Sequence, residues 1–182
     1  MRFKFYSVYV VIFAILFFVN NSSAMEVYTN PVSGYSVKIK QPWSVVRIPD
    51  PMADLFLICD VDACGQDARL SFGSIFDQKL KKSKIDDLIK EMNGVSITET
   101  IRSSPMVDSV TLLSEGFFKV GDNSGYEVVS RILAKNGKTR LRHTFIMIRA
   151  GYVYTVNLGV PPESYRMALN HAKVLLSFYT LP

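Results

Sequence analysis

The sequence predicts an α+β fold in which an antiparallel β-sheet is flanked by helices, an α/β/α layered sandwich. Two observations predict it. Four strand-like segments follow one another between residues 110 and 160, separated by short turn-forming stretches, as in an antiparallel meander. A segment near the C-terminal end then has the 3.6-residue periodicity of an amphipathic helix, which needs a sheet face to cover.

The N-terminal stretch has the pattern of a secretory signal peptide. Arg2 and Lys4 precede fifteen almost wholly apolar residues, and Ser22 and Ala24 are small residues of the kind that signal peptidase accepts. As a helix the apolar run spans about 22 Å, short of the roughly 30 Å hydrocarbon core of a bilayer, which argues against an uncleaved anchor. No cysteine lies near the cleavage point, so a lipoprotein anchor is not expected.

We therefore expect residues 1–24 to be a cleaved signal peptide and residues 25–182 to form a single domain. This domain would be secreted or periplasmic, in a bacterium, with no stable membrane anchor after cleavage. Without the signal peptide the chain has 19 basic and 16 acidic residues, a net charge of +3. The densest basic run, residues 79–84, reads as a solvated loop, so we expect no nucleic-acid partner.

The first strand of this domain is predicted over residues 34–40. There Tyr35, Val37 and Ile39 alternate with more polar residues, as in a half-buried strand. A glutamine and a proline end the strand, and Trp43 follows them directly. A tryptophan at a strand end usually packs against a sheet edge.

Residues 54–59 form a short apolar run and residues 69–76 alternate in polarity, so both are predicted strands. The only two cysteines, Cys59 and Cys64, lie at the junction between them. In an oxidising compartment their simplest arrangement is a disulfide with each other. Their spacing differs from the CxxC motif of redox catalysis, and a zinc site would need two further ligands. We expect a structural disulfide that closes the loop.

Three aspartates in this loop raise a calcium-binding alternative. Asp60 and Asp62 match positions 1 and 3 of a calcium loop, and Gly65 matches the glycine at position 6. Position 12 is Ser71, where a bidentate glutamate should be, so the loop supplies too few oxygen ligands. The main prediction is a solvated, disulfide-closed turn without metal, with Asp60, Asp62 and Asp67 as the candidate ligands of the alternative.

A helix is predicted over residues 83–93. Ser83 is its N-cap, Asp86 follows three residues later as in a capping box, and Gly94 ends it. Residues 95–101 are rich in valine, isoleucine and threonine, and we predict a strand there.

Four strands follow in the predicted meander. Asn136 and Gly137 form a two-residue hairpin signal, since both residue types tolerate positive φ. Gly151 is placed to turn the next pair. The predicted strands cover residues 110–120, 125–135, 139–150 and 152–160.

The C-terminal helix begins near Pro162, which suits a first helical turn, and Glu163 complements the helix dipole there. An apolar stripe with helical spacing follows. It comprises Tyr165, Leu169, Ala172 and Leu176, widened by Met167 and Val174. This stripe is predicted to cover one face of the sheet.

Four stretches of the chain resemble the Mog/PsbP-like group of proteins. They are YTNPVSGYSVKIKQPWSV at 28–45, GYEVVSRI at 125–132, RAGYVYTVNLGVPPESY at 149–165 and SFYTLP at 177–182. The resemblance implies an antiparallel sheet flanked by helices. It also implies a binding or assembly module with no cofactor and no set of catalytic residues. The cysteine loop is not part of the pattern.

The residues themselves contain no recognisable catalytic motif. His143 lies in a predicted strand and reads as an ordinary surface or packed histidine, and His171 reads as a solvated position of the C-terminal helix. A secreted hydrolase with a site built from scattered polar residues is nevertheless an alternative. A cleft that holds His143 with a carboxylate and a hydroxyl would favour it.

Aromatic residues supply the candidate binding surface. Tyr152 and Tyr154 share one face of a predicted strand, and Tyr165 and Trp43 add amphipathic rings that could anchor a partner. The function predicted from the sequence is therefore an exported, non-enzymatic binding or accessory protein that recognises a protein or an envelope component.

Overall fold

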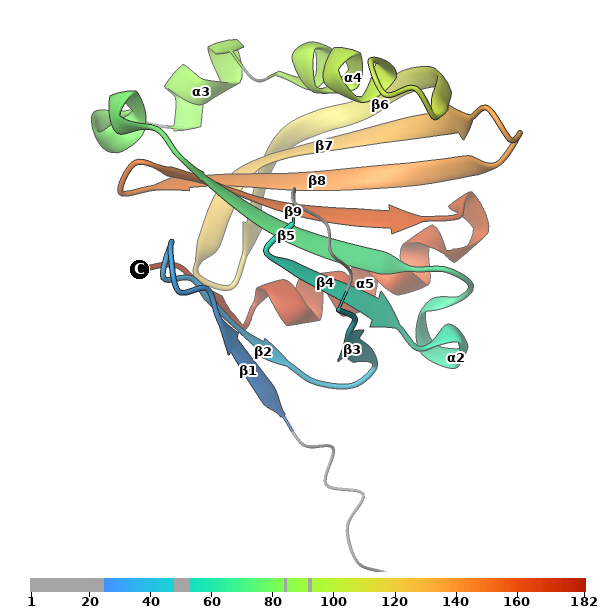
Figure 1. Cartoon of the computed structure of the whole chain (residues 1–182), viewed down its shortest axis with the longest axis horizontal. Coiled ribbons are helices and arrows are strands. Elements are labelled where there is room, and N and C mark those ends of the chain that lie inside the picture. Colours follow the sequence, from blue (N-terminus) through green and yellow to red (C-terminus); the bar gives the residue numbers. More distant parts are fainter. Residues whose placement is uncertain (1–24, 48–52, 84, 92) are drawn as a thin grey trace, which may run out of the picture.

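The computed structural model describes residues 25–47, 53–83, 85–91 and 93–182 (Figure 1). The predicted signal peptide, residues 1–24, lies outside this range. A seven-stranded antiparallel sheet has the order β3-β4-β5-β9-β8-β7-β6, and a three-stranded sheet has the order β1-β2-β10. The strands are β1 (Glu26–Thr29), β2 (Ser36–Ile39), β3 (Trp43–Val45), β4 (Leu55–Cys59), β5 (Arg69–Phe76), β6 (Val107–Val120), β7 (Asn123–Ala134), β8 (Thr139–Arg149), β9 (Tyr152–Val160) and β10 (Tyr179–Thr180). The helices are α2 (Val61–Cys64), η1 (Gln78–Lys82), α3 (Ile85–Glu91), α4 (Gly94–Arg102), η2 (Pro162–Ser164) and α5 (Tyr165–Leu176).

The predicted meander is confirmed as β6 to β9, which pair in sequence order. The turn between β7 and β8 falls at the predicted dipeptide. Gly137 has a φ of 78°, and the Asn136 side chain accepts a hydrogen bond from the Lys138 N–H at 3.1 Å. Because this turn is tight, the pairing of β7 and β8 begins directly beside it, with Leu133 opposite Thr139, and continues to Tyr126 opposite Ile146.

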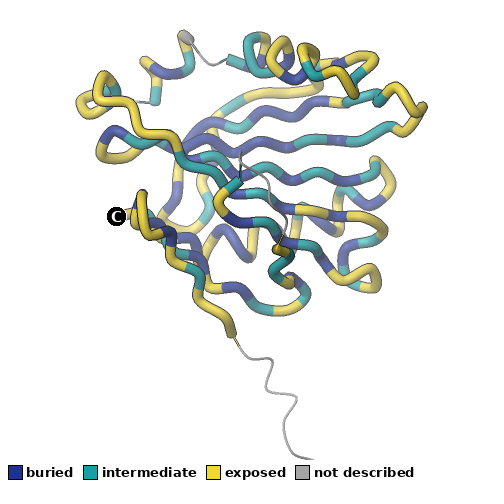
Figure 2. Tube along the Cα trace, viewed as in Figure 1, coloured by how far each residue is buried: buried dark blue, intermediate teal, exposed yellow. Residues whose placement is uncertain are grey.

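One face of the large sheet packs against α5 and the small sheet. The aromatic residues Tyr35, Phe72 and Tyr154 have no exposed surface there, and the centroid of the Tyr179 ring lies 5.2 Å from that of Tyr35. Figure 2 shows the buried stretches concentrated in the central strands and along the inner side of α5. This larger core ties the small sheet and the C-terminal helix to the meander.

The other face of the large sheet carries a smaller core. Leu88 of α3 packs against Ile146 and Val153, with partly buried residues of η1 and α4 around them. Figure 1 shows α3 and α4 beside the β6–β8 end of the sheet. Helices thus lie on both faces, and the α+β fold with an antiparallel sheet is confirmed.

The strand predicted over residues 95–101 is wrong, because these residues belong to α4. Gly94 does not end a helix but is the first residue of α4, and Asn93 is its N-cap, accepting from the Ser96 N–H at 3.0 Å. The Thr98 hydroxyl donates to the Val95 carbonyl at 2.8 Å. Side-chain hydrogen bonds of this kind let β-branched residues remain in a helix despite their modest propensity.

The helix predicted near the C-terminal end is confirmed, but its buried stripe is narrower than expected. Ala168, Ala172, Leu175 and Leu176 are buried. Met167 and Val174 are 48% and 49% exposed, so their assignment to the buried stripe is wrong. Within the described residues, no helix is long and apolar enough to cross a membrane.

Candidate functional site

The edge strand β3 borders two adjoining hollows. The larger, of about 750 Å³, is lined by residues 41–44 and 58–63. The smaller, of about 330 Å³, is lined by residues 26, 39–41 and 43–45. Both hollows share Trp43 and Ser44, so they form one depression that runs along β3 from α2 towards the small sheet.

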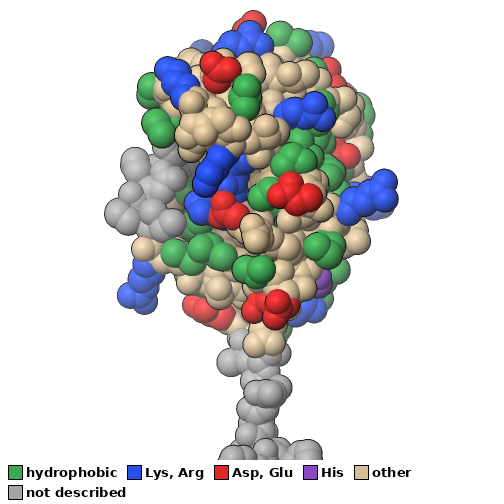
Figure 3. All heavy atoms as spheres, turned by 90° about the vertical axis from the view of Figure 1, so that its right-hand side faces the viewer, with side chains coloured by type: hydrophobic (Ala, Val, Ile, Leu, Met, Phe, Trp, Pro, Cys, Tyr) green, Lys and Arg blue, Asp and Glu red, His purple; other side chains and the backbone are tan. Residues whose placement is uncertain are grey.

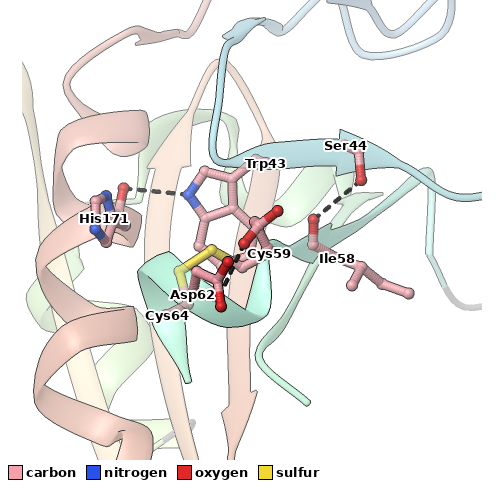
Figure 4. Close-up of a disulfide and its surroundings, with 8 residues drawn as sticks. Trp43, Ser44, Ile58, Cys59, Asp62, Cys64 and His171 are labelled. Carbon is pink, nitrogen blue, oxygen red and sulfur yellow. Dashed lines mark hydrogen bonds between the residues drawn. A yellow bond between two sulfur atoms is a disulfide. The ribbon is translucent and has the colours of Figure 1, made fainter. Parts of the chain in front are cut away.

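Trp43 is the floor of this depression, and Figure 4 shows how it is held. Its indole N–H points to the backbone carbonyl of His171 on α5, at 3.4 Å, and its ring lies beside the disulfide. Trp43 pairs with Cys59 across β3 and β4, and only 4% of its surface is exposed. The sequence-based expectation that Trp43 packs a sheet edge is confirmed, and its role in binding stays a prediction.

Cys59 and Cys64 form the predicted disulfide, with their Cα atoms 6.0 Å apart. The residues between them form the short helix α2, where the sequence predicted a turn. The Asp60 carboxylate begins α2 by accepting from the Asp62 N–H at 2.8 Å. Gly65 then ends it with a φ of 76°, and a Cβ atom at this position would lie 2.3 Å from the Ser164 hydroxyl oxygen. The loop is therefore packed tightly against the start of α5.

The aspartates of this loop have protein partners. Asp60 serves as a helix cap, and the Asp67 carboxylate bonds to the guanidinium groups of both Arg69 and Arg140. These arginines lower the pKa of Asp67 against the opposing effect of its partial burial. Among the described residues, no group of three or more histidine, cysteine or acidic side chains could hold a metal ion.

The outer side of β3 has backbone groups that the sheet does not use. The Val46 N–H donates to the Phe56 carbonyl at 2.9 Å, and the Pro42 carbonyl accepts from the Asp60 N–H at 2.9 Å. In an antiparallel pair, residues that bond to the neighbouring strand alternate with residues that do not, so the backbone N–H and C=O of Val45 point away from β4. Ser44, the residue before Val45 on β3, is exposed. An edge of this kind can accept an added strand.

The three tyrosines of the predicted binding surface do not form one cluster, because Tyr165 lies apart from Tyr152 and Tyr154. The rings of Tyr152 and Tyr154 stack at 5.7 Å, and their hydroxyl groups donate to the carbonyls of Val32 and Ser33. Tyr165 contacts His143, which pairs with Leu158, six residues along β9 from Tyr152. At about 3.3 Å per residue this is a separation of roughly 20 Å. Their role in binding stays a prediction.

His143 is the centre of a buried polar chain. Its Nε2 lies 2.9 Å from the Glu127 carboxylate and its Nδ1 lies 3.0 Å from the Tyr165 hydroxyl. The imidazole also stacks on Phe145, with ring centroids 4.1 Å apart, and is 2% exposed. The neutral ring that fits this geometry donates from Nε2 to Glu127 and accepts at Nδ1 from Tyr165.

The hydrogen-bonded side chains of Glu127, His143 and Tyr165 are the carboxylate, the histidine and the hydroxyl that the hydrolase alternative requires. Its chemistry nevertheless favours a structural role. Burial lowers the pKa of His143, and it raises the pKa of Tyr165, which Glu127 raises further. Both groups therefore stay neutral, and both ring nitrogens are already bonded. A general base needs a nitrogen within reach of a substrate proton.

Two polar residues that hold the fold together were not found from the sequence. Glu127 looked like an ordinary strand residue, and Asn123 looked like part of a turn. The Asn123 amide donates to the carbonyls of Leu176 and Tyr179, at 2.9 and 2.7 Å, and so ties β7 to the end of α5. The partners of Asn123 are more than 50 residues away in the chain, and no local pattern signals them.

Comparisons with solved structures identify the fold. The chain is similar to cyanobacterial PsbP (CyanoP) from Synechocystis, with 15% sequence identity, a TM-score of 0.62, and coverage of 90% of this chain and 95% of that one. It is similar to LpqN of Mycobacterium tuberculosis, which is involved in cell envelope biogenesis, with 10% identity, a TM-score of 0.55 and coverage of 89% and 88%. It is also similar to the Saccharomyces cerevisiae Ran-binding protein Mog1p, with 10% identity, a TM-score of 0.51 and coverage of 88% of this chain and 96% of that one.

The chain therefore has the Mog/PsbP-like fold, as the sequence resemblance implied. No protein-family model matches the chain, and no curated protein matches it either. Because proteins that share a fold can differ in function, the structural similarity does not identify a partner or an activity for this chain.

Proposed function

We propose that this chain is an exported, non-enzymatic binding protein that recognises a protein or an envelope component through the depression along β3. The observation that carries the proposal is the coincidence of a hollow of about 750 Å³ with an edge strand that has unused backbone groups. An extended segment of a protein partner would add to β3 and place alternate side chains in the two hollows. Ser44, exposed and common to both hollows, would lie under that segment.

The descriptions of two proteins that share the fold agree with this role. Mog1p is a Ran-binding protein, and LpqN is involved in cell envelope biogenesis. The signal-peptide pattern of residues 1–24 supports export, and export supports an oxidised Cys59–Cys64 pair. The disulfide and Trp43 would then fix the shape of the binding edge before a partner arrives, which lowers the entropic cost of binding.

The binding edge is tested by affinity capture with residues 25–182 as bait, from the native cell envelope and the culture medium. The Ser44→Arg variant fills the depression from an exposed position, where surface substitutions change stability by about 0.5 kcal/mol or less. Ser109→Arg on β6, the strand at the opposite edge of the sheet, is the matched control. We expect a partner that is captured by the wild type and by Ser109→Arg but lost with Ser44→Arg. Capture that is equal for all three proteins would exclude the β3 edge.

Export is tested separately by mass spectrometry of the protein purified from its native host. We expect Met25 as the first residue and a mass two hydrogens below that of the reduced chain. Protein that retains residues 1–24 and has two free thiols would contradict export.

A further inference from the structure

The strand β8 carries a partly buried cation on the face of the sheet opposite α5. Arg142 is half-buried, and burial lowers its pKa. Its Nε and Nη2 donate to the Asn157 side-chain oxygen, at 3.2 and 2.9 Å. Among the described residues, no carboxylate pairs with it. Taking a charge partly out of water without a counterion costs free energy, which an anionic ligand would offset.

The hydrogen bonds between Arg142 and Asn157 leave donor groups of both side chains unused among the described residues. The Asn157 oxygen also accepts from the Thr144 hydroxyl at 2.8 Å, so it takes three hydrogen bonds in all. The amide nitrogen of Asn157 and the Nη1 of Arg142 then remain as donors without a partner in the described part of the chain. A cluster made of unused donors matches a ligand that brings only acceptor oxygens.

A glycine leaves room for such a ligand. Gly159 on β9 pairs with Arg69 on one side and with Arg142 on the other. A Cβ atom on Gly159 would have no neighbour within 4 Å among the described residues, so none of them fills the space above the sheet at this point. The two arginines lie two strand spacings apart, about 10 Å, and flank this gap.

The charge of the surroundings is positive. Arg69 and Arg140 share the single carboxylate of Asp67, so these three side chains and Arg142 carry a formal charge of +2. Figure 3 shows Lys and Arg side chains gathered in a recess at the middle of the face that it views, beside an acidic group. A dianionic oxyanion would neutralise this cluster.

We propose that the gap over Gly159 is an oxyanion site that binds a phosphate group, with Arg142 and the Asn157 amide as its donors and Arg69 as the second charged wall. The phosphate group is either free or part of a headgroup or other ester, because both present the same oxygens. This site lies on the sheet face away from α5 and does not involve β3. Its failure would leave the proposed partner-binding edge untouched.

The first test measures thermal stability and NMR chemical shifts of residues 25–182 as inorganic phosphate is added, against potassium chloride at matched ionic strength. We expect phosphate to raise the melting temperature through ligand linkage and to shift the backbone signals of residues 157–159. Arg142→Gln should weaken phosphate binding about ten- to a hundredfold, the usual effect of losing hydrogen bonds to a charged group. Arg131→Gln, an exposed arginine of β7, is the matched control and should bind like the wild type.

The same experiment separates a binding role from a structural one. If Arg142 serves a ligand, Arg142→Gln without phosphate should melt at the same temperature as the wild type or higher, since a partly buried charge without a carboxylate partner is removed. The assignment is overturned if phosphate has no effect on the wild type beyond that of chloride. It is also overturned if Arg142→Gln binds phosphate as well as the wild type does.

A second variant blocks the gap without changing charge. Gly159 has no positive φ and open space at its Cβ, so Gly159→Val should fold normally, and valine favours a strand. We expect it to abolish the phosphate effect while keeping all three arginines. Phosphate binding by Gly159→Val at the wild-type strength would show that the ligand does not sit over Gly159, and would overturn the proposal.

Two further arms identify the source of the phosphate group. Co-sedimentation with phosphatidylglycerol vesicles that is lost with Arg142→Gln would support a headgroup ligand. Binding of glycerol 3-phosphate or inorganic phosphate without vesicle binding would support a soluble ligand. Vesicle binding that is unchanged in Arg142→Gln, with no binding of soluble phosphate, would mean general surface attraction and would overturn the site.

Discussion

Arg142 and His143 are neighbours in the chain but lie on opposite faces of the same strand. His143 faces α5, where a carboxylate and a hydroxyl occupy both of its ring nitrogens. Arg142 faces the other way and meets only the side-chain oxygen of Asn157. The difference teaches that the two polar groups are treated differently: the imidazole has a partner at each ring nitrogen, whereas the guanidinium has no carboxylate partner among the described residues.

The two faces also differ in how they are packed. The α5 face is sealed by fully buried aromatic side chains such as Phe72, Phe145 and Tyr154. On the opposite face the smaller core beneath α3 covers only part of the sheet, and Gly159 and Thr155 are partly exposed. We infer that the α5 face provides most of the stability, and the following changes test that inference.

The largest effect is expected on the α5 face. Phe145 is fully buried between the His143 ring and an edge-on Phe118 ring, 5.1 Å away. Phe145→Ala should lower the free energy of unfolding by about 3–5 kcal/mol, because it removes apolar contacts and leaves a cavity. Thr155→Ala, on the opposite face, should cost about 1 kcal/mol or less. Urea denaturation of both variants measures the contrast, and equal losses would refute the division of roles.

The disulfide gives the second effect. Both sulfur atoms are buried in the α5-side core, and the loop that they close spans five sequence positions. A loop of this length constrains the unfolded chain by about 2 kcal/mol. The double variant Cys59→Ala/Cys64→Ala should lose roughly this amount in urea denaturation. The wild type under a reducing agent is the control, and it should lose a similar amount if the cross-link itself is responsible.

The third effect depends on pH. Burial holds the pKa of His143 below the ordinary 6.5, despite the opposing effect of Glu127, and Lys173 lowers it further. As the pH falls below about 6.5, the unfolded chain takes up a proton at this histidine first. The free energy of unfolding should therefore fall with decreasing pH until the pKa of the folded state is reached.

Denaturation at pH 7.5, 6.5 and 5.5 measures this slope. His143→Gln has no group to titrate at this position, so it should lose less stability than the wild type between pH 7.5 and 5.5. His171→Gln is the matched control, because that histidine lies on the partly exposed side of α5. A slope that is unchanged in His143→Gln would show that its burial is not coupled to folding.

Much of the fold could be predicted because its signals are local. The alternation of Tyr35, Val37 and Ile39 marked β2, and all three residues are buried. The Asn136–Gly137 turn and the pairing of the only two cysteines likewise follow from neighbouring residues. The helix α4 could not be predicted in this way. Its β-branched residues suggested a strand, and the Gly94 N–H that begins it is bonded to Glu115 on a distant strand, at 2.6 Å.

The candidate sites were less accessible from the sequence than the fold. Trp43 and the cysteine loop were singled out, but their hollow exists only because β3 pairs with β4 beside α5. The gap between Arg69 and Arg142 depends on two strand registers, which pair Gly159 with Arg69, 90 positions away, and with Arg142, 17 positions away. Such proximity is a property of topology, and no residue pattern along the chain carries it.

The smallest effects come from two tyrosine hydroxyls on the α5 face. The Tyr165 hydroxyl bonds to His143, whereas the Tyr179 hydroxyl is buried without a partner in the described residues. Tyr165→Phe removes a hydrogen bond and leaves the Nδ1 of His143 unsatisfied, so it should cost about 1 kcal/mol. Tyr179→Phe removes a hydroxyl that gains nothing from burial, so stability should stay the same or rise slightly.

Urea denaturation of these two variants compares the same chemical change at two buried rings. A loss for Tyr165→Phe alone would mean that the α5 face depends on its bonded polar groups as well as on its aromatic packing. Equal losses would mean that the Tyr179 hydroxyl has a partner in solution, such as a buried water. In that case the Tyr179 hydroxyl is hydrogen-bonded as well. Arg142 then remains the partly buried charge without a carboxylate partner in the described residues.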